Sequence, residues 1–300
     1  MTADGDVLTV TDQEYGDLFW GIRGGGGNFG VATALQYRAH YVPDVLGGLI
    51  AHPLEHAVPV IERYHDVTAT APDELTAFLG LLHAPDGSGM KLIGTALCHC
   101  GDAQQAERDV GAFRGTPTSA VDTVARLPYP AMNTMLDDAF PPGTLNYWKS
   151  AFLKDLSTDS VGVLVDAFVR CPSTMTSIVI AHYHGATSRV APTATAMPHR
   201  GPGYSCVILT EWTDPADTNA NLSWTQETFE TLHPHTTDRV YVNNLSNDDT
   251  GAVPSAYGVN WDRLVEVKRR YDPDNIFRLN HNIDPSAHRA DAAVFAPVTR

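Results

Sequence analysis

Cysteine, positive charge and long apolar runs are all scarce in this sequence. Four irregularly spaced cysteines (Cys98, Cys100, Cys171 and Cys206) argue against a disulfide framework and favour a reducing compartment. Lys and Arg total 20 against 35 Asp and Glu, which gives a net charge of -15. The chain therefore lacks the positive potential that would attract nucleic acid or an anionic membrane. No apolar run approaches the roughly 18 residues that cross a bilayer, and the first residues do not resemble a signal peptide. We therefore expect a cytoplasmic protein that binds neither nucleic acid nor membrane.

The rest of the composition is that of a globular protein with a real core, because 43% of the residues are hydrophobic and 18% are charged. Residue patterns predict extended segments at 6–12, 29–41, 46–54, 75–83, 90–99, 145–150, 178–184 and 205–212. Helical spacing predicts helices at 17–23, 60–67, 103–113, 161–168 and 217–232, and a last helix with residues 261, 264, 265 and 268 on one side. Strands that come in pairs between helices indicate an α+β fold, with a mostly antiparallel sheet covered by helices on one face.

Helix ends can be assigned from a few residues. Thr158 or Asp159 is expected to cap the helix at 161–168, and Asn260 the last helix, which Pro273 ends. A break at 42–44 marks a candidate domain boundary, and the Ala-rich tail after about residue 283 is expected to be unstructured.

The most unusual stretch is DLFWGIRGGGGNFGVAT, residues 17–33, with four consecutive glycines. A Walker-type phosphate loop needs Lys and then Ser or Thr after its last glycine, but Asn28 and Phe29 follow here. A Rossmann fingerprint needs a helix after the glycines, and here a strand is expected. Both nucleotide motifs fail, so the residues by themselves favour a surface turn that glycine's conformational freedom permits.

Several stretches together resemble the FAD-linked oxidases of the berberine-bridge-enzyme-like family, within the vanillyl-alcohol-oxidase or PCMH-type flavoproteins. They occur in the family's order over nearly the whole chain: DLFW at 17–20, RGGGGNFGV at 23–31, YWKS at 147–150, RVAP at 189–192, YVN at 241–243, YG at 257–258, YDPDN at 271–275 and FRLNHN at 277–282. The resemblance implies that the glycine segment closes a flavin domain, and that its glycines let the backbone approach FAD closely.

In that family most of the FAD-binding domain precedes this segment, so the resemblance implies a C-terminal portion. The expected domains are a remnant of the PCMH-type FAD-binding domain at 1–42, an α+β substrate domain at 43–235, a berberine-like segment returning to the flavin at 236–285 and a disordered tail at 286–300. The residues that match flavin-approaching positions are Gly27, Asn28, Gly30, Val31, Tyr241, Asn243, Asn280 and Asn282.

The implied reaction is hydride transfer from an alcohol, sugar or amine-bearing small molecule to FAD, with O2 as acceptor. Family members often carry a tyrosine base where this chain has Asn244, and a carboxamide cannot act as a base. Tyr147, Tyr183 or an aspartate near Asp248 remain as candidate bases, although strand tyrosines also occur as plain packing residues.

Two other functional classes stay open. The chain is alternatively a non-catalytic α+β module, either a remnant or a subunit completed by a partner chain that supplies the FAD-binding half. A metal hydrolase is the third hypothesis, since His182 and His184 share one side of a predicted strand and His199 follows. No carboxylate or cysteine at ligand spacing completes that set, so we expect no metal site. Buried packing is also the simplest interpretation of Cys98-His99-Cys100.

Overall fold

The computed structural model describes residues 1–115, 118–279 and 281–287, which fall into two compact units. Unit 1 comprises Met1–Ala39, Thr187–Gly201 and Asp238–Arg300, and unit 2 comprises His40–Ala186 and Pro202–Thr237. The segment Thr187–Gly201 therefore packs with the two ends of the chain, although it lies inside the stretch expected to form the substrate domain.

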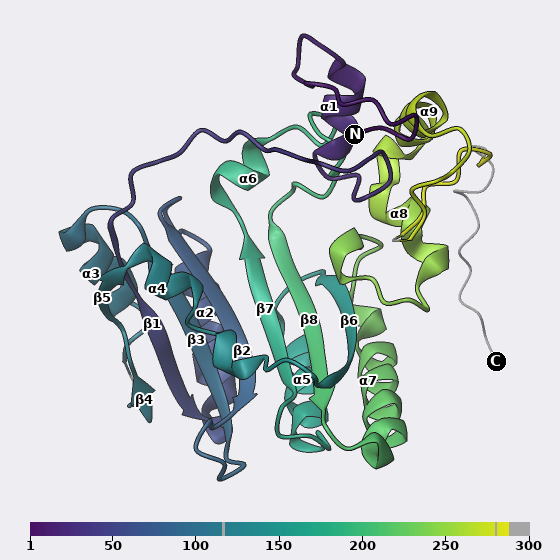
Figure 1. The fold of residues 1–300 in the computed structure, drawn as a ribbon. Helices are drawn as coiled ribbons and strands as arrows, with labels where there is room; N and C mark the ends of the chain where they lie inside the picture. Colours follow the sequence, from purple (N-terminus) through teal and green to yellow (C-terminus); the bar gives the residue numbers. More distant parts are fainter. Residues whose placement is uncertain (116–117, 280, 288–300) are drawn as a thin grey trace. The chain divides into compact units, whose positions relative to one another are not determined.

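Unit 2 is built on an antiparallel sheet with the strand order β4-β1-β3-β2-β7-β8-β6, and β5 also pairs with β1 (Figure 1). The strands are β1 (Asp44–Pro53), β2 (Leu75–His83), β3 (Lys91–His99), β4 (Val121–Asp122), β5 (Ala125–Pro128), β6 (Leu145–Leu153), β7 (Ser177–Tyr183) and β8 (Gly203–Trp212). This sheet confirms the predicted α+β class. The short strands β4 and β5 had no sequence signal that we recognised.

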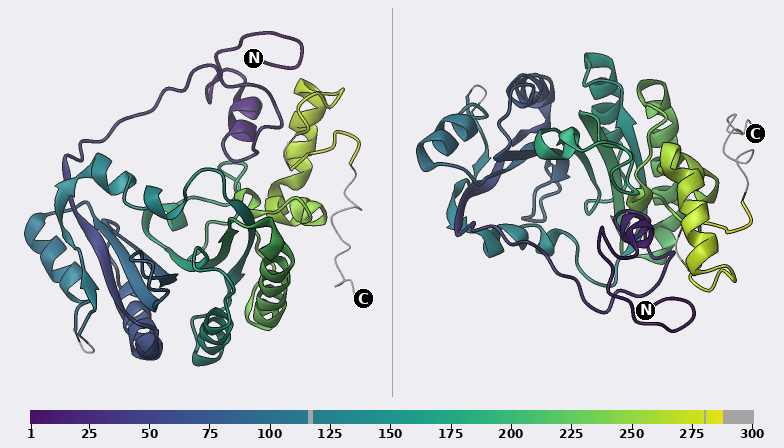
Figure 2. Two further views of the ribbon diagram at one scale, coloured as in Figure 1. Left: turned by 60° about the horizontal axis from the view of Figure 1, so that its bottom comes forward. Right: turned by 90° about the horizontal axis from the view of Figure 1, so that it is seen from above.

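Helices cover one face of this sheet, as the blue, teal and green helices of Figure 2 show. They are α2 (Ala57–Thr68), α3 (Ala103–Gly111), α5 (Thr158–Val169) and α7 (Thr218–Leu232), while the short α4 (Tyr129–Asn133) contacts β1 and β5. Alternation along β2 turns Leu75, Ala77, Leu79 and Leu81 into the core beneath the helices.

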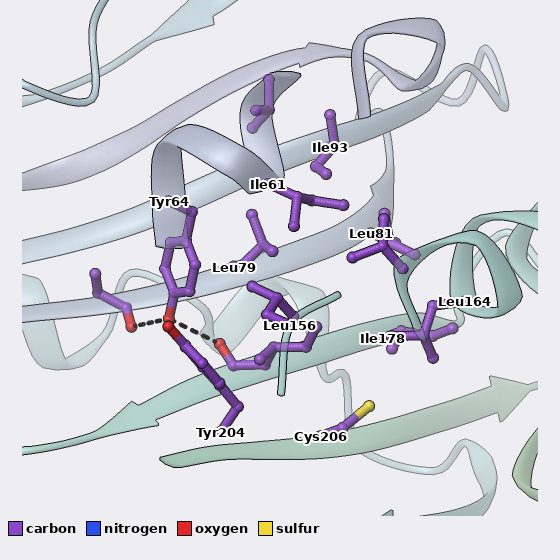
Figure 3. Close-up of a cluster of buried hydrophobic side chains, with 14 of the residues drawn as sticks. Ile61, Tyr64, Leu79, Leu81, Ile93, Leu156, Leu164, Ile178, Tyr204 and Cys206 are labelled. Atoms are coloured by element: carbon purple, nitrogen blue, oxygen red, sulfur yellow. Dashed lines mark hydrogen bonds between the residues drawn. The ribbon is translucent and has the colours of Figure 1, made fainter. Parts of the chain in front are cut away.

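Tyr64 of α2 anchors that core (Figure 3). Its ring is fully buried, and its hydroxyl donates to the backbone oxygen of Ala77 at 2.9 Å and lies 3.4 Å from that of Ile180. One side chain thus joins a helix to two neighbouring strands, because β2 pairs with β7.

The predicted cap of α5 is wrong by one residue. Ser157 occupies the N-cap position, and its hydroxyl accepts a hydrogen bond from the backbone N–H of Ser160. Thr158 and Asp159 lie within the first turn, where the backbone is already helical, so neither acts as the cap.

Unit 1 has its own core around α1 (Gly16–Ile22), the short α8 (Val253–Tyr257) and α9 (Trp261–Tyr271), which includes Leu18, Trp20, Phe29, Tyr257, Trp261 and Leu264. The short α6 (Gly185–Arg189) leads into the segment Thr187–Gly201, whose residue Thr193 accepts a hydrogen bond from the Trp20 indole at 2.8 Å. None of the described helices is long and apolar enough to span a membrane.

The strands predicted at 6–12 and 29–41 are wrong. Neither range forms a strand, although the backbones of Met1 and Val31 exchange two hydrogen bonds, at 2.9 and 2.7 Å. A strand needs a neighbour that accepts and donates along its length, and no such neighbour exists among the described residues. The alternating side chains predicted the extended shape but not the missing partner.

Asn260 also acts differently from the prediction. It occupies the N-cap position of α9, but its side chain makes no capping hydrogen bond. Its amide N–H groups point instead to the backbone oxygens of Pro192, Thr195 and Ala196, at 2.8, 3.1 and 3.2 Å. The residue therefore fixes the 192–196 turn against α9, and the helix ends at Tyr271, just before Pro273, as expected.

Candidate functional site

The glycine loop follows α1 directly, and packing explains its first two glycines. A Cβ on Gly24 would lie 2.6 Å from the backbone nitrogen of Met197, and one on Gly25 would overlap the backbone oxygen of Gly21. Gly24 and Gly26 are both exposed and have positive φ, +120° and +67°, but a Cβ on Gly26 would have no atom nearer than 3.6 Å. Gly27 is also exposed. The loop therefore presents bare backbone to solvent at residues 26–27.

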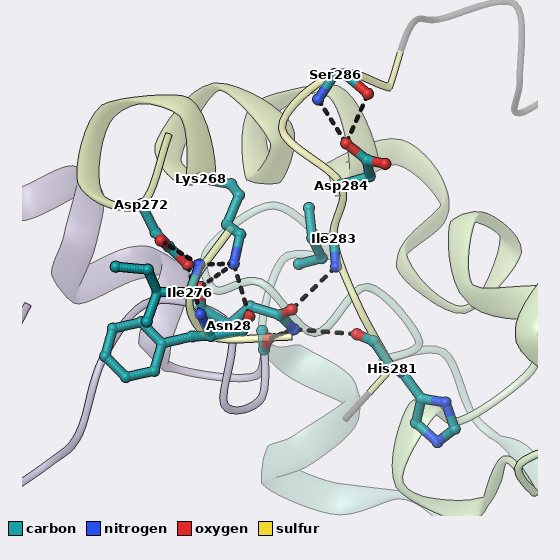
Figure 4. Close-up of polar contacts among 10 residues, drawn as sticks. Asn28, Lys268, Asp272, Ile276, His281, Ile283, Asp284 and Ser286 are labelled. Carbon is teal, nitrogen blue, oxygen red and sulfur yellow. Dashed lines mark hydrogen bonds and ion pairs between the residues drawn. The ribbon is translucent and has the colours of Figure 1, made fainter. Parts of the chain in front are cut away.

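Asn28 holds the loop to the C-terminal segment (Figure 4). Only 2% of its surface is exposed, and its amide N–H groups donate to the backbone oxygens of Gly25 and His281 at 2.9 and 3.1 Å. Its side-chain oxygen accepts from the backbone N–H of Ile283 at 2.9 Å. Both amide hydrogens are used within the protein, so a cofactor contact by Asn28 would have to come from its other groups.

A buried ion pair strengthens the same junction. Lys268 of α9 is fully buried, and its ammonium donates to Asp272 at 2.6 Å, to the backbone oxygen of Asn28 at 2.9 Å and to that of Phe277 at 2.7 Å. Asp272 also accepts the backbone N–H groups of Ile276 and Phe277, at 2.7 and 2.8 Å. Burial by itself would raise the pKa of Asp272, but the hydrogen bonds from Lys268 and the two backbone amides outweigh it and lower that pKa.

The other residues predicted to approach the flavin lie beside the glycine loop or in the segment after α9. Val31 is paired with Met1, and a Cβ on Gly30 would lie 2.5 Å from the Met1 oxygen. Asn282 lies between His281 and Ile283, which both bond to Asn28, and its side-chain oxygen is buried without a hydrogen-bond partner among the described residues. Asn280 lies outside the described residues.

Tyr241 and Asn243 bond to each other, because the Asn243 amide donates to the Tyr241 hydroxyl at 2.8 Å. The His281 ring lies 3.1 Å from the backbone oxygen of Leu245, which brings the 241–245 stretch alongside the junction. The structure therefore gathers the loop and the C-terminal matches in unit 1. Asp248, near which a base was expected, is exposed.

Sequence reasoning missed the role of Tyr257. Only 1% of its surface is exposed, and its hydroxyl has no hydrogen-bond partner among the described residues. That hydroxyl would lie 3.6 Å from a Cβ on Gly26. The Tyr257-Gly258 pair was visible as a motif, but a sequence does not show which core tyrosine leaves its hydroxyl unsatisfied.

The two tyrosines proposed as bases lie on opposite faces of the unit 2 sheet. Tyr147 pairs in register with Thr210, whose hydroxyl contacts Thr225 of α7, so Tyr147 is on the helix-covered face. Tyr183 alternates with the core residue Ile180 and is on the other face, where its ring packs edge-on against Phe152 at 5.2 Å. The two candidate bases therefore cannot both face the same side of this sheet.

The histidines give no metal centre among the described residues. His182 and His184 stack in unit 2 with ring centroids 4.9 Å apart, while His199 belongs to unit 1. Burial, together with the neighbouring His184 and His65, lowers the pKa of His182 to about 4. Such a ring stays neutral near pH 7 and behaves as a packed aromatic.

The chain is similar in sequence to a known protein family and to several FAD-linked oxidoreductases. Residues 240–284 match the family model "Berberine and berberine like". The chain is 26% identical over 288 residues to an FAD-linked oxidoreductase of Dictyostelium discoideum, covering 94% of this chain and 61% of that protein. It is 28% identical over 301 residues to (R)-6-hydroxynicotine oxidase of Paenarthrobacter nicotinovorans, covering 95% of this chain and 64% of that protein. The chain thus spans less than two thirds of the length of these relatives.

Solved structures agree with these matches. The crystal structure of 6-hydroxy-D-nicotine oxidase from Arthrobacter nicotinovorans superposes with a TM-score of 0.81 at 25% identity, covering 95% of this chain and 64% of that one. A berberine-bridge-enzyme-like protein of Arabidopsis thaliana has the same TM-score at 19% identity, which shows the shared fold.

Proposed function

Because this chain is a relative of the berberine-bridge-enzyme-like FAD-linked oxidoreductases, as the resemblance predicted, we propose that it serves FAD-dependent oxidation of a small molecule. The substrate class we propose is an alcohol, sugar or amine-bearing compound that gives up a hydride, with O2 as the final acceptor. Bound FAD would supply the hydride-accepting ring, while the protein would bind and orient the partners.

One observation carries this proposal: hydrogen bonds tie the glycine loop to the segment after α9, although the bonded residues are 253 and 255 positions apart in sequence. Both segments match flavin-approaching parts of the family. The residues present fit such a ligand in two ways. Gly26 exposes backbone without a side chain in the way, and Tyr257 and Asn282 each keep a buried polar atom without a partner among the described residues.

On the substrate side we propose Tyr183 as the residue that handles a proton. It stands on the sheet face that the helices leave uncovered, whereas Tyr147 does not. A tyrosine that has lost its own proton can accept the proton of a substrate N–H or O–H within hydrogen-bond reach as the hydride leaves, and it becomes the neutral phenol. Asn244 cannot perform this step.

The test is spectroscopic. Purified chain is titrated with FAD, and bound flavin is followed by its visible absorption after gel filtration. A stoichiometric yellow complex that bleaches anaerobically with an amine, alcohol or sugar supports the proposal. A chain that stays colourless with excess FAD would contradict flavin binding by these 300 residues.

A second candidate rests on residues 32–39. Leu35 and Tyr37 are 64% and 80% exposed, and no backbone group of this range makes a hydrogen bond within the described residues. An extended, apolar segment with free backbone groups is suited to pair with further strands. We propose that it pairs with FAD-binding strands, whether of the same polypeptide or of a partner chain, and that the chain is inactive without them. Hydrogen exchange tests this: amides 32–39 should exchange rapidly in the isolated chain, and protection there would contradict it.

A further inference from the structure

The hydroxyl of Tyr257, a residue of the unit 1 core, has no hydrogen-bond partner among the residues that the structure describes. Its ring stacks with Trp261, with the centroids 6.2 Å apart, so packing fixes where the hydroxyl points. Buried hydroxyls in native proteins nearly always have a partner, because an unsatisfied one costs stability. An unsatisfied hydroxyl at a defined place therefore calls for an explanation.

The hydroxyl lies beneath Gly26. Within 4 Å of the point where a Cβ on Gly26 would sit there are two atoms, the Tyr257 hydroxyl at 3.6 Å and the Asn28 amide nitrogen at 3.7 Å. Gly26 is exposed, whereas the Tyr257 hydroxyl is buried on the side of Gly26 toward which a Cβ would project. The φ of +67° accounts for glycine here, but it does not account for the hydroxyl.

The Asn28 nitrogen is already committed to Gly25 and His281, which leaves Tyr257 as the donor without a partner beside Gly26. Successive backbone N–H groups around a residue in the left-handed conformation form concave surfaces that bind anions, and Gly26 has the positive φ of that conformation. A neutral phenol adds a donor to such a surface without bringing in a competing charge.

We propose that Tyr257 is a ligand-binding residue, whose hydroxyl donates a hydrogen bond to a phosphate oxygen of the dinucleotide seated on Gly26. This rests on the proposed function, since it names FAD as the ligand. Burial raises the pKa of Tyr257, so the hydroxyl keeps its proton and remains a donor beside an anion. Contact requires Gly26 to move aside slightly, which its freedom of conformation allows.

The test compares the full chain with Tyr257→Phe by calorimetric titration of FAD, ADP and riboflavin. Losing one hydrogen bond to a charged acceptor should weaken FAD and ADP binding about tenfold to a hundredfold. Riboflavin, which has no phosphate, should bind both proteins equally. The unfolding temperature without ligand should be unchanged or higher in Tyr257→Phe, because the substitution removes an unsatisfied group.

Tyr64→Phe is the matched control, since its hydroxyl has backbone partners in unit 2. It should lower the unfolding temperature and leave ligand affinity unchanged. If Tyr257→Phe binds FAD and ADP as tightly as wild type does, the inference is overturned and the proposed function stands. The same holds if Tyr257→Phe unfolds at a lower temperature and its ligand affinities are unchanged. If wild type binds ADP in a way that depends on Tyr257 but does not bind FAD, only the flavin function is rejected. If wild type binds neither ligand, both the flavin function and the role of Tyr257 are rejected.

Discussion

Replacing Lys268 with methionine should destabilise unit 1 strongly. Methionine keeps most of the side-chain volume but removes an ammonium that bonds to Asp272, Asn28 and Phe277. Both members of the ion pair have no exposed side-chain surface, so water cannot replace the lost contacts. The Asp272 carboxylate would remain buried beside two backbone N–H groups and without a counter-charge.

Removing one partner of a buried ion pair typically costs about 3 to 5 kcal/mol. The two remaining amide donors to Asp272 place the expected loss near the lower end, about 3 kcal/mol, or roughly a hundredfold in the unfolding equilibrium. That is a large part of the 5 to 15 kcal/mol by which a domain is typically stable.

Lowering the pH should reduce the difference in the free energy of unfolding between wild type and Lys268→Met. In wild type the pKa of Asp272 is lowered, so its contribution is present above the ordinary carboxyl value and is lost as the pH falls through the lower folded value. In Lys268→Met the main bond that lowers this pKa is gone, so burial should raise it. Protonation of Asp272 then removes the unpaired buried charge, so the variant recovers stability relative to wild type as the pH falls towards about 4.

Urea unfolding measures the loss, and hydrogen exchange at Ile283, whose N–H bonds to Asn28, localises it. Lys154→Met is the control, because that ammonium is exposed and bonds only the Pro234 oxygen among the described residues; its loss should change stability by less than about 0.5 kcal/mol. A Lys268→Met protein as stable as wild type at pH 7 would refute the reasoning.

Three further outcomes are expected. Tyr64→Phe should lose about 1 kcal/mol in thermal unfolding, because a buried hydrogen bond between α2 and the sheet disappears; no loss would mean that ring packing alone holds the helix. Asp17→Asn should flatten the acid limb of the stability curve. Burial by itself would raise the pKa of Asp17, but hydrogen bonds, including the one from the Tyr271 hydroxyl, outweigh burial and lower that pKa. Wild type therefore loses stability as the pH falls through the pKa of Asp17 in the folded state. An equally steep loss of stability in acid for Asp17→Asn would contradict this reasoning. Tyr183→Phe should slow anaerobic flavin reduction about a hundredfold or more if it takes the proton, while Tyr147→Phe should not; equal rates in both variants would remove Tyr183 from the chemistry.

Local patterns predicted most of the elements. Alternation along 75–83 matches β2 residue for residue, and Pro273 correctly predicted the end of α9 at Tyr271. The motifs also predicted the similarity to FAD-linked oxidoreductases that the comparisons found. These successes share a cause: each depends on side chains within a few positions of one another, where period and turn chemistry act directly.

The site depended on contacts that no local pattern encodes. Asn28 matched a motif, but its bonds to His281 and Ile283, and that of its backbone to Lys268, join residues about 240 to 255 positions apart. The segment 29–41 had the alternation of a strand, yet it lacks a neighbour to pair with among the described residues.

Sequence alone therefore determined most of the longer helices and strands, and which family the chain resembles. Tertiary structure decided that Tyr147 and Tyr183 lie on opposite faces of the sheet, and that the Tyr257 hydroxyl lies beside Gly26 with no hydrogen-bond partner in the described part of the chain. The physical reason is that hydrogen-bond satisfaction and burial are properties of the whole packed unit, settled only when segments distant in the chain meet.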